Sequence, residues 1–248
     1  MFLYGIACYA VFFATFLYAV GFLGDFAVPK AIDSPRDTGF GTALAIDVGL
    51  LALFAVQHSV MARPAFKRAW TRIVPEAAER STYVLFSSLA LIVLFAFWQP
   101  MGVAIWTATS SAGSNAAWTL FALGWALLLY CTFLIDHFDL FGLRQVWLYA
   151  RGKPYTSVKF RTPWLYRQVR HPLYIGWLLI VWSTPAMTLA HLVFAILSTA
   201  YILVAIQFEE RDLIDAHPEY AEYKRRVPMI VPFAKRSASP RSATDGAR

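Results

Sequence analysis

The chain has 248 residues, of which 58% are hydrophobic and only 15% are charged. This composition excludes an ordinary soluble domain, because several uncharged runs reach about 20 residues, the length that crosses a bilayer. The net charge of +7 does not indicate a nucleic-acid partner, since the basic residues flank apolar runs and orient membrane segments there. We expect a multi-pass protein in a lipid bilayer, with no nucleic acid and no obligate protein partner.

Long apolar runs predict four membrane-spanning helices, near residues 2–24, 40–62, 82–98 and 116–138. The first run lacks the basic start and the cleavage site of a signal peptide, so we expect it to be retained. Cys8 and Cys131 lie inside these runs, where buried free cysteines are expected rather than a disulfide.

Basic residues gather in three segments: five from Arg63 to Arg80, seven from Arg144 to Arg170, and eight from Arg211 onward. Cytoplasmic loops carry the excess of Lys and Arg, so these segments and both termini are predicted to be cytoplasmic. The loop between the third and fourth runs has no charge and is predicted to face outward.

The apolar stretch 173–208 must therefore enter the membrane and return on the same side. Pro185 predicts a break, because proline removes a backbone donor, and it leaves arms of about 12 and 23 residues. The first arm is too short to cross the bilayer. The fold class predicted is an all-α integral membrane protein: four spanning helices, a C-terminal helical hairpin giving five to six membrane segments, and a cytoplasmic amphipathic C-terminal helix.

Ionisable residues collect at the predicted cytoplasmic ends of these segments. The hairpin brings Glu209 and Glu210 back to the level of Arg170 and His171, and His58 lies near the end of the second span. Such residues are costly in a membrane and are functional candidates. The alternatives are a polar helix contact for His58 and interfacial anchors for the arginine and histidine.

Three segments, RHPLYIGW from Arg170, EERDL from Glu209 and HPEYAEYKRRVPMIVP from His217, resemble the C-terminal pattern of the isoprenylcysteine carboxyl methyltransferase family. The resemblance covers about residues 163–233. It implies that S-adenosyl-L-methionine binds from the cytoplasmic side and leaves S-adenosyl-L-homocysteine as product. The implied cofactor residues are Tyr166, Arg170, His171, Tyr174, Gly176, Glu209, Glu210, Tyr220 and Tyr223. Arg170 and His171 suit the cofactor carboxylate, and Glu210 its amino or ribose groups.

Two further segments, FAVQHSVMARPAFK from Phe54 and DHFDLFGLRQVWLYARGKPY from Asp136, resemble one bacterial branch of that family, the methanethiol S-methyltransferases, to which NnrU-type proteins are related. This resemblance implies a bacterial inner-membrane enzyme that methylates methanethiol, a small volatile thiol, to dimethyl sulfide. The chain departs from the protein-methylating enzymes, because it lacks an obvious groove motif for a prenylated peptide. It also has His217–Pro218 where Phe-Gly is more usual.

Methyl transfer from a sulfonium to a thiol is an in-line displacement, so the protein must align the partners and help the thiol lose its proton. His58, oriented by Asp136, is the first candidate base, and Arg144 could stabilise the thiolate instead. We expect one transmembrane methyltransferase domain over 1–234, with the cofactor part at about 136–233, and a disordered cytoplasmic tail over 235–248.

Other functions stay open at this point. A methyltransferase for a larger lipophilic acceptor of the isoprenylcysteine type, or a non-enzymatic NnrU-type membrane protein, would share the hairpin. A reductase using a nicotinamide cofactor is disfavoured, since the chain has no GxGxxG motif. No metal is expected, because the five histidines include no HxxH-type pair.

Overall fold

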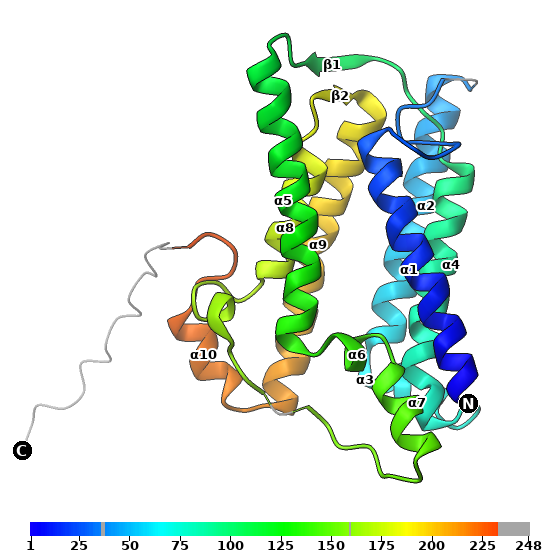
Figure 1. Ribbon diagram of the computed structural model, residues 1–248, viewed down its shortest axis with the longest axis vertical. Helices are drawn as coiled ribbons and strands as arrows, with labels where there is room; N and C mark the ends of the chain where they lie inside the picture. Colours follow the sequence, from blue (N-terminus) through cyan, green and yellow to red (C-terminus); the bar gives the residue numbers. More distant parts are fainter. Residues whose placement is uncertain (36–37, 159, 233–248) are drawn as a thin grey trace, which may run out of the picture.

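The computed structural model describes residues 1–35, 38–158 and 160–232, so the predicted tail 235–248 lies outside the described residues. Five helices lie side by side in one bundle (Figure 1) and are long and apolar enough to cross a membrane: α1 (Phe2–Gly24), α2 (Phe40–Ala62), α4 (Glu76–Phe97), α5 (Ser111–Ile135) and α9 (Leu189–Ala216). Large apolar side chains such as Leu53 and Val204 stay exposed on their outer faces, as contact with lipid requires. The chain is therefore an all-α, multi-pass membrane protein, as predicted.

Two of the spans are longer at their start than the apolar runs predict. Helix α4 begins at Glu76 instead of residue 82, because acidic residues in its first turn favour a helix N-terminus. Helix α5 begins at Ser111, where the side chain of Ser110 accepts a hydrogen bond from the Gly113 amide at 3.1 Å. It ends at Ile135, so Asp136 lies just outside the span.

The predicted hairpin is present. Its first arm is α8 (Pro172–Trp182), whose 11 residues at 1.5 Å each are too short to cross the bilayer, and its second arm is α9. Helix α8 packs closely on α5, because a Cβ added at Gly176 would lie only 2.9 Å from the Gly124 carbonyl oxygen. Small residues at such a crossing let two helix backbones approach each other.

A short antiparallel pair of strands, β1 (Ala104–Thr107) and β2 (Ala186–Thr188), covers the hairpin turn and was not predicted. The helical hydrogen bonds end at this turn, so its backbone groups need other partners. The loop before α5 supplies them: the Leu189 amide donates to the Val103 carbonyl and the Ala108 amide to the Pro185 carbonyl, both at 2.8 Å.

Short helices gather at the opposite end of the bundle, together with the N-terminus (Figure 1). We call this the basic end, because the segments here hold most of the Lys and Arg residues. The predicted amphipathic C-terminal helix is present as α10, which buries Tyr220 and exposes Arg225 and Arg226. The short helices are α3 (Pro64–Trp70), α6 (His137–Leu140), α7 (Leu143–Ala150), the 3-10 turn η1 (Trp164–Arg167) and α10 (Tyr220–Arg226).

Candidate active site

The Arg170–His171–Pro172 sequence starts helix α8 and also holds the C-terminal segment in place. Pro172 stands at the first helical position, where its missing N–H costs nothing, and His171 precedes it in a non-helical conformation. The Arg170 amide donates to the Pro228 carbonyl at 2.9 Å and the His171 amide to the Met229 carbonyl at 3.1 Å. The chain after α10 therefore returns to the start of the hairpin.

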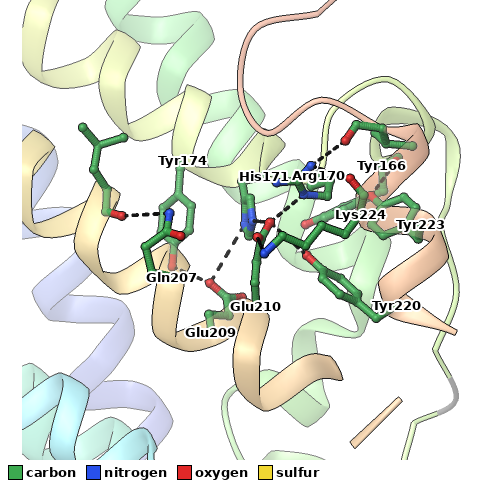
Figure 2. A network of polar contacts seen from close by, with 12 residues as sticks. Tyr166, Arg170, His171, Tyr174, Gln207, Glu209, Glu210, Tyr220, Tyr223 and Lys224 are labelled. Atoms are coloured by element: carbon green, nitrogen blue, oxygen red, sulfur yellow. Dashed lines mark hydrogen bonds and ion pairs between the residues drawn. The ribbon is translucent and has the colours of Figure 1, made fainter. Parts of the chain in front are cut away.

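Glu210 is the centre of a buried charged network (Figure 2). Its side chain is 1% exposed, and Oε1 accepts hydrogen bonds from Arg170 Nε at 2.5 Å and His171 Nε2 at 3.0 Å. Its other oxygen, Oε2, lies 2.8 Å from Lys224 Nζ on α10. The Tyr220 hydroxyl also donates to Oε1, at 3.4 Å. Glu210 thus joins α9, the start of α8 and α10 at one point.

Arg170 completes the attachment of α10. Its Nη1 donates to the carbonyl oxygens of Lys224 at 3.0 Å and Val227 at 2.6 Å, at the C-terminus of that helix. A cation at this position stabilises the helix dipole and the free carbonyl groups. Arg170 and Glu210 were predicted to contact the cofactor directly, but most of their polar atoms are already paired within the protein.

Glu209, the neighbour of Glu210, has a different environment. Its side chain is 42% exposed, and its Oε2 accepts a hydrogen bond from the Tyr174 hydroxyl at 2.9 Å (Figure 2). His171 Nδ1 lies 4.0 Å from the same oxygen. Because successive residues of a helix point about 100° apart, the two carboxylates separate into a buried one and one that borders open space.

That open space is a cavity of about 350 Å³, which we call the cofactor cavity. Its size falls in the range of small-molecule sites. Seven of the nine predicted cofactor residues line it, whereas Glu210 does not and Gly176 is buried against α5. The lining residues are Ile135, Leu140, Val158, Phe160, Arg161, Thr162, Tyr166, Arg170, His171, Leu173, Tyr174, Glu209, Leu213, His217, Tyr220 and Tyr223.

Aromatic rings cover the cofactor cavity on the α10 side. The Phe160 ring meets those of Tyr220 and Tyr223 edge to face, with centroids 5.6 Å apart in both pairs. The Tyr223 hydroxyl donates to the Tyr166 carbonyl at 2.5 Å, and burial raises the pKa of Tyr223 to about 12. The Tyr223 hydroxyl therefore stays protonated near pH 7 and can donate a hydrogen bond. Phe160 was not among the predicted cofactor residues, because it stands between other aromatic residues of the same segment, such as Tyr155 and Trp164, and nothing in the sequence distinguishes it from them.

His58 belongs to a second polar group, between α2 and α4. Its Nδ1 lies 3.2 Å from the Ser87 Oγ, and its Nε2 lies 3.0 Å from the Tyr83 hydroxyl. The described residues show no contact between His58 and Asp136, so the prediction that Asp136 orients His58 is wrong. Tyr83 and Ser87 take that role instead. They are one helical turn apart on α4, which places both on the face toward α2.

The two polar groups approach each other through residues of α9. Tyr201 on α9 lies 3.1 Å from the Ser59 hydroxyl, next to His58. The hydroxyls of Tyr83 and Tyr201 are close enough to Glu209 to interact with its charge, and Tyr174 interacts with both of these tyrosines. The side of the cofactor cavity formed by Tyr174 and Glu209 therefore faces the His58 group.

Asp136 and Arg144 hold the chain that follows α5. Asp136 Oδ1 caps α6 by accepting a hydrogen bond from the Asp139 amide at 3.1 Å. Arg144 Nη1 lies 2.8 Å from Asp139 Oδ1, and its two terminal nitrogens bind the carbonyl and hydroxyl oxygens of Thr156. Asp139 raises the pKa of Arg144 by hydrogen bonding to it. The geometry favours an anchor for the loop near Thr156 over the predicted thiolate contact.

Comparison with known proteins finds relatives that are methanethiol S-methyltransferases. The chain is 58% identical to the methanethiol S-methyltransferase of Crocosphaera subtropica over 93% of this chain and 91% of that protein. It is 52% identical to the one of Mycobacterium tuberculosis over 94% and 96%, and 33% identical to nurim of Xenopus laevis over 71% and 65%. No family model and no solved structure matches. The chain belongs to the methanethiol S-methyltransferase family.

Proposed function

We propose that this protein transfers the methyl group of S-adenosyl-L-methionine to methanethiol and releases dimethyl sulfide. The observation that carries the proposal is the position of the cofactor cavity, which borders the partly exposed carboxylate of Glu209 and faces the His58 group. The names of the relatives supply the acceptor.

The residues around the cofactor cavity fit the cofactor chemically. S-adenosyl-L-methionine supplies a methyl group on a positively charged sulfur, together with a carboxylate, an ammonium group and an adenosine. Glu209 and the faces of Tyr174, Tyr220 and Tyr223 suit the positive charge. Two guanidinium groups suit the carboxylate. One belongs to Arg161, and the other is that of Arg170, whose Nη2 has no partner among the described residues.

The remaining predicted residues support this site. His171 and Tyr166 form part of the wall of the cofactor cavity. Glu210 fixes the α10 cover, and Gly176 allows α8 to approach α5.

The His58 group supplies the acceptor side. Ser87 contacts the Nδ1 of His58, and the Tyr83 hydroxyl lies within 3.2 Å of both ring nitrogens, nearer to Nε2 at 3.0 Å. In the proposed reaction Nε2 takes the S–H proton of methanethiol as the thiol sulfur forms a bond to the methyl carbon. The bond from that carbon to the cofactor sulfur breaks at the same time, so S-adenosyl-L-homocysteine and dimethyl sulfide form without any redox step.

We assign residues 1–234 to one transmembrane domain, with the cofactor part at about 136–233. The basic end is assigned to the cytoplasm of a bacterial inner membrane, with both termini on that side, because cytoplasmic loops carry the Lys and Arg excess. The cofactor cavity then opens toward the compartment that contains the soluble cofactor.

The direct test is headspace gas chromatography of purified protein mixed with methanethiol and S-adenosyl-L-methionine. We expect dimethyl sulfide from the wild type and from Glu222→Gln, a control on an exposed part of α10 outside the cofactor cavity. Glu209→Gln should slow the reaction at least tenfold, roughly the value of one charge-assisted hydrogen bond. If the wild type makes no dimethyl sulfide and binds no S-adenosyl-L-homocysteine, the proposal is wrong.

A further inference from the structure

A second cavity, of about 520 Å³, lies at the basic end between α3, α4 and α7. It shares no lining residue with the cofactor cavity, and α6 separates the two: Asp139 lines the second cavity and Leu140 the first. The lining residues are Lys67, Pro75, Glu76, Ala77, Glu79, Arg80, Asp139, Gln145, Tyr149, Lys153, Pro154 and Tyr155.

Three cations line the second cavity, Lys67, Arg80 and Lys153, and none of them forms an ion pair within the described part of the chain. The Nε of Arg80 donates to the Leu140 carbonyl at 2.7 Å, and its guanidinium lies over the Tyr83 ring, 5.0 Å from the centroid. Among the described residues, its two terminal nitrogens have no hydrogen-bond partner. Lys67 likewise forms no ion pair in the described part of the chain. Burial, followed by the charge of Arg80, lowers the pKa of Lys67, whereas the charge of Glu79 raises it. Lys67 and Arg80 line the same cavity and are half-buried. An oxyanion with several acceptor oxygens would satisfy both groups.

The same cavity also offers acceptors. Gln145 is 9% exposed, and its Nε2 donates to the Asp139 carbonyl at 3.1 Å while its Oε1 has no partner. Glu76 and Glu79 add two carboxylates, whereas that of Asp139 is already paired with Arg144. A buried acceptor without a partner is costly, and it would be satisfied by a ligand that donates N–H groups.

The position of the cavity at the end of a membrane span suits a lipid headgroup. The first residues of α4, a candidate membrane span, line the cavity. Ile73, in the loop before this helix, is 79% exposed. Tyr149, which lines the cavity, is 57% exposed. Exposed aliphatic and aromatic side chains beside cations are typical of a membrane–water interface.

We propose that the second cavity binds a phosphoethanolamine headgroup of a membrane lipid. Its phosphate would lie against Lys67 and Arg80, and its primary ammonium would donate to Gln145 Oε1 and Glu79. A trimethylated ammonium has no N–H to donate, and a headgroup that ends in hydroxyls has no positive charge for the carboxylates. The site therefore selects a primary ammonium together with a phosphate.

The test is native mass spectrometry of the purified protein with equal amounts of short-chain phosphatidylethanolamine, phosphatidylglycerol and phosphatidylcholine. We expect the wild type to retain the ethanolamine lipid several times more often than the other two, and this comparison needs no variant. Equal retention of all three lipids would overturn the proposal.

Variants then assign the two ends of the headgroup. Lys67→Gln should reduce retention of the ethanolamine lipid about fivefold, while Arg68→Gln, the same change at an exposed position of α3 outside the cavity, should not reduce it. Glu79→Gln should remove the preference for ethanolamine over glycerol headgroups. If Arg68→Gln and Lys67→Gln lose the ethanolamine lipid equally, general surface charge explains the retention and the proposed site is refuted.

Competition identifies the source of the headgroup. Millimolar O-phosphoethanolamine should displace little lipid, because the acyl chains add apolar burial that the free compound lacks. Displacement at micromolar concentration would overturn the membrane as the source. Displacement by methionine, which carries a carboxylate and an ammonium group, would overturn the assignment of the anionic end to phosphate.

Discussion

Arg170 Nε and Glu210 Oε1 lie 2.5 Å apart, and both side chains are almost fully buried. The pair joins the residue two positions before the hairpin's short arm α8 to the last two turns of its long arm α9. Lys224 and the carbonyls at the end of α10 bind to the same two residues, so the pair holds the cover of the cofactor cavity rather than the cofactor itself.

Removing one partner of this pair should release α10. Glu210→Gln leaves Arg170 charged and poorly paired in a buried place, which typically costs about 3 to 5 kcal/mol. We expect faster tryptic cleavage after Arg225 or Arg226 and a lower thermal midpoint in detergent. Glu222→Gln, which breaks only the exposed Arg226–Glu222 pair on the same helix, should change neither. Unchanged cleavage in Glu210→Gln would refute the holding role.

Glu209 should act on the charge of the cofactor and not on the fold. Its carboxylate borders the cofactor cavity, where it suits a positive sulfur. Glu209→Gln should therefore weaken binding of S-adenosyl-L-methionine about tenfold more than binding of S-adenosyl-L-homocysteine, which has no sulfonium charge. Calorimetric titration of both compounds measures the difference. An equal loss for the two would place Glu209 away from the sulfur.

The spans and the hairpin could be predicted because length, apolarity and loop charge are local properties of the chain. Basic segments precede and follow the stretch 173–208, so this stretch was predicted to enter the membrane and leave it on the same side. The short helix α8 and the long helix α9 form the hairpin that this prediction requires. The β1–β2 pair could not be predicted in this way. It depends on contact between residues such as Ala104 and Thr188, which only the folded bundle brings together.

The site was predicted at the level of segments but not of individual roles. Glu209 and Glu210 are identical neighbours in sequence, and only the rotation of α9 decides which is buried and which borders the cofactor cavity. In the same way, nothing in the apolar run of α4 shows that Tyr83 and Ser87 face His58. Such pairings depend on how two helices are rotated against each other, which a single sequence does not reveal.

Asp33 should make stability depend on pH. It lies at the end of the bundle opposite the basic end, where the Thr188 hydroxyl donates to it and His191 Nδ1 lies 3.9 Å away. Burial raises the pKa of Asp33 from 3.8 to about 6, and the nearby Asp25 adds to the rise. The folded protein therefore binds more protons than the unfolded chain between these values, so stability falls as pH rises from about 4 to 6 and is constant above.

Thermal midpoints in detergent between pH 4 and pH 7 test this dependence. The full shift corresponds to roughly 3 kcal/mol as an upper value. Asp33→Asn keeps a hydrogen-bonding group but cannot titrate, so it should flatten the profile over this window. A variant profile with the same slope as the wild type would show that other groups are responsible.

The orientation of the bundle can be tested by labelling. In a background with Cys8→Ala and Cys131→Ala, single cysteines in place of Ser111, at the start of α5, and of Ser239, outside the described residues, should react from opposite sides of intact membranes. A membrane-impermeant maleimide applied to whole spheroplasts should reach only Ser111→Cys. Labelling of both from outside would contradict the cytoplasmic assignment of the C-terminal segment.

His58 should act on the proton of the thiol and not on the cofactor. His58→Ala is expected to leave the affinity for S-adenosyl-L-homocysteine nearly unchanged while the rate of dimethyl sulfide formation falls by about 10²- to 10⁴-fold, the usual contribution of a general base. The defect should shrink as pH rises, because above the pKa of the thiol the nucleophile is already a thiolate. Tyr83→Phe, which removes the hydroxyl 3.0 Å from His58 Nε2, should give a smaller loss of rate.

His58→Gln is the matched control, since it keeps a polar side chain of similar reach that cannot take up a proton near neutral pH. A proton-transfer role requires that glutamine be nearly as inactive as alanine at pH 7 and that both variants recover at high pH. If glutamine restores most of the activity, His58 is a hydrogen-bonding residue, and the thiol loses its proton elsewhere. If the loss of rate is the same at every pH, His58 aligns the thiol, because a missing base would no longer matter once the thiol is ionised.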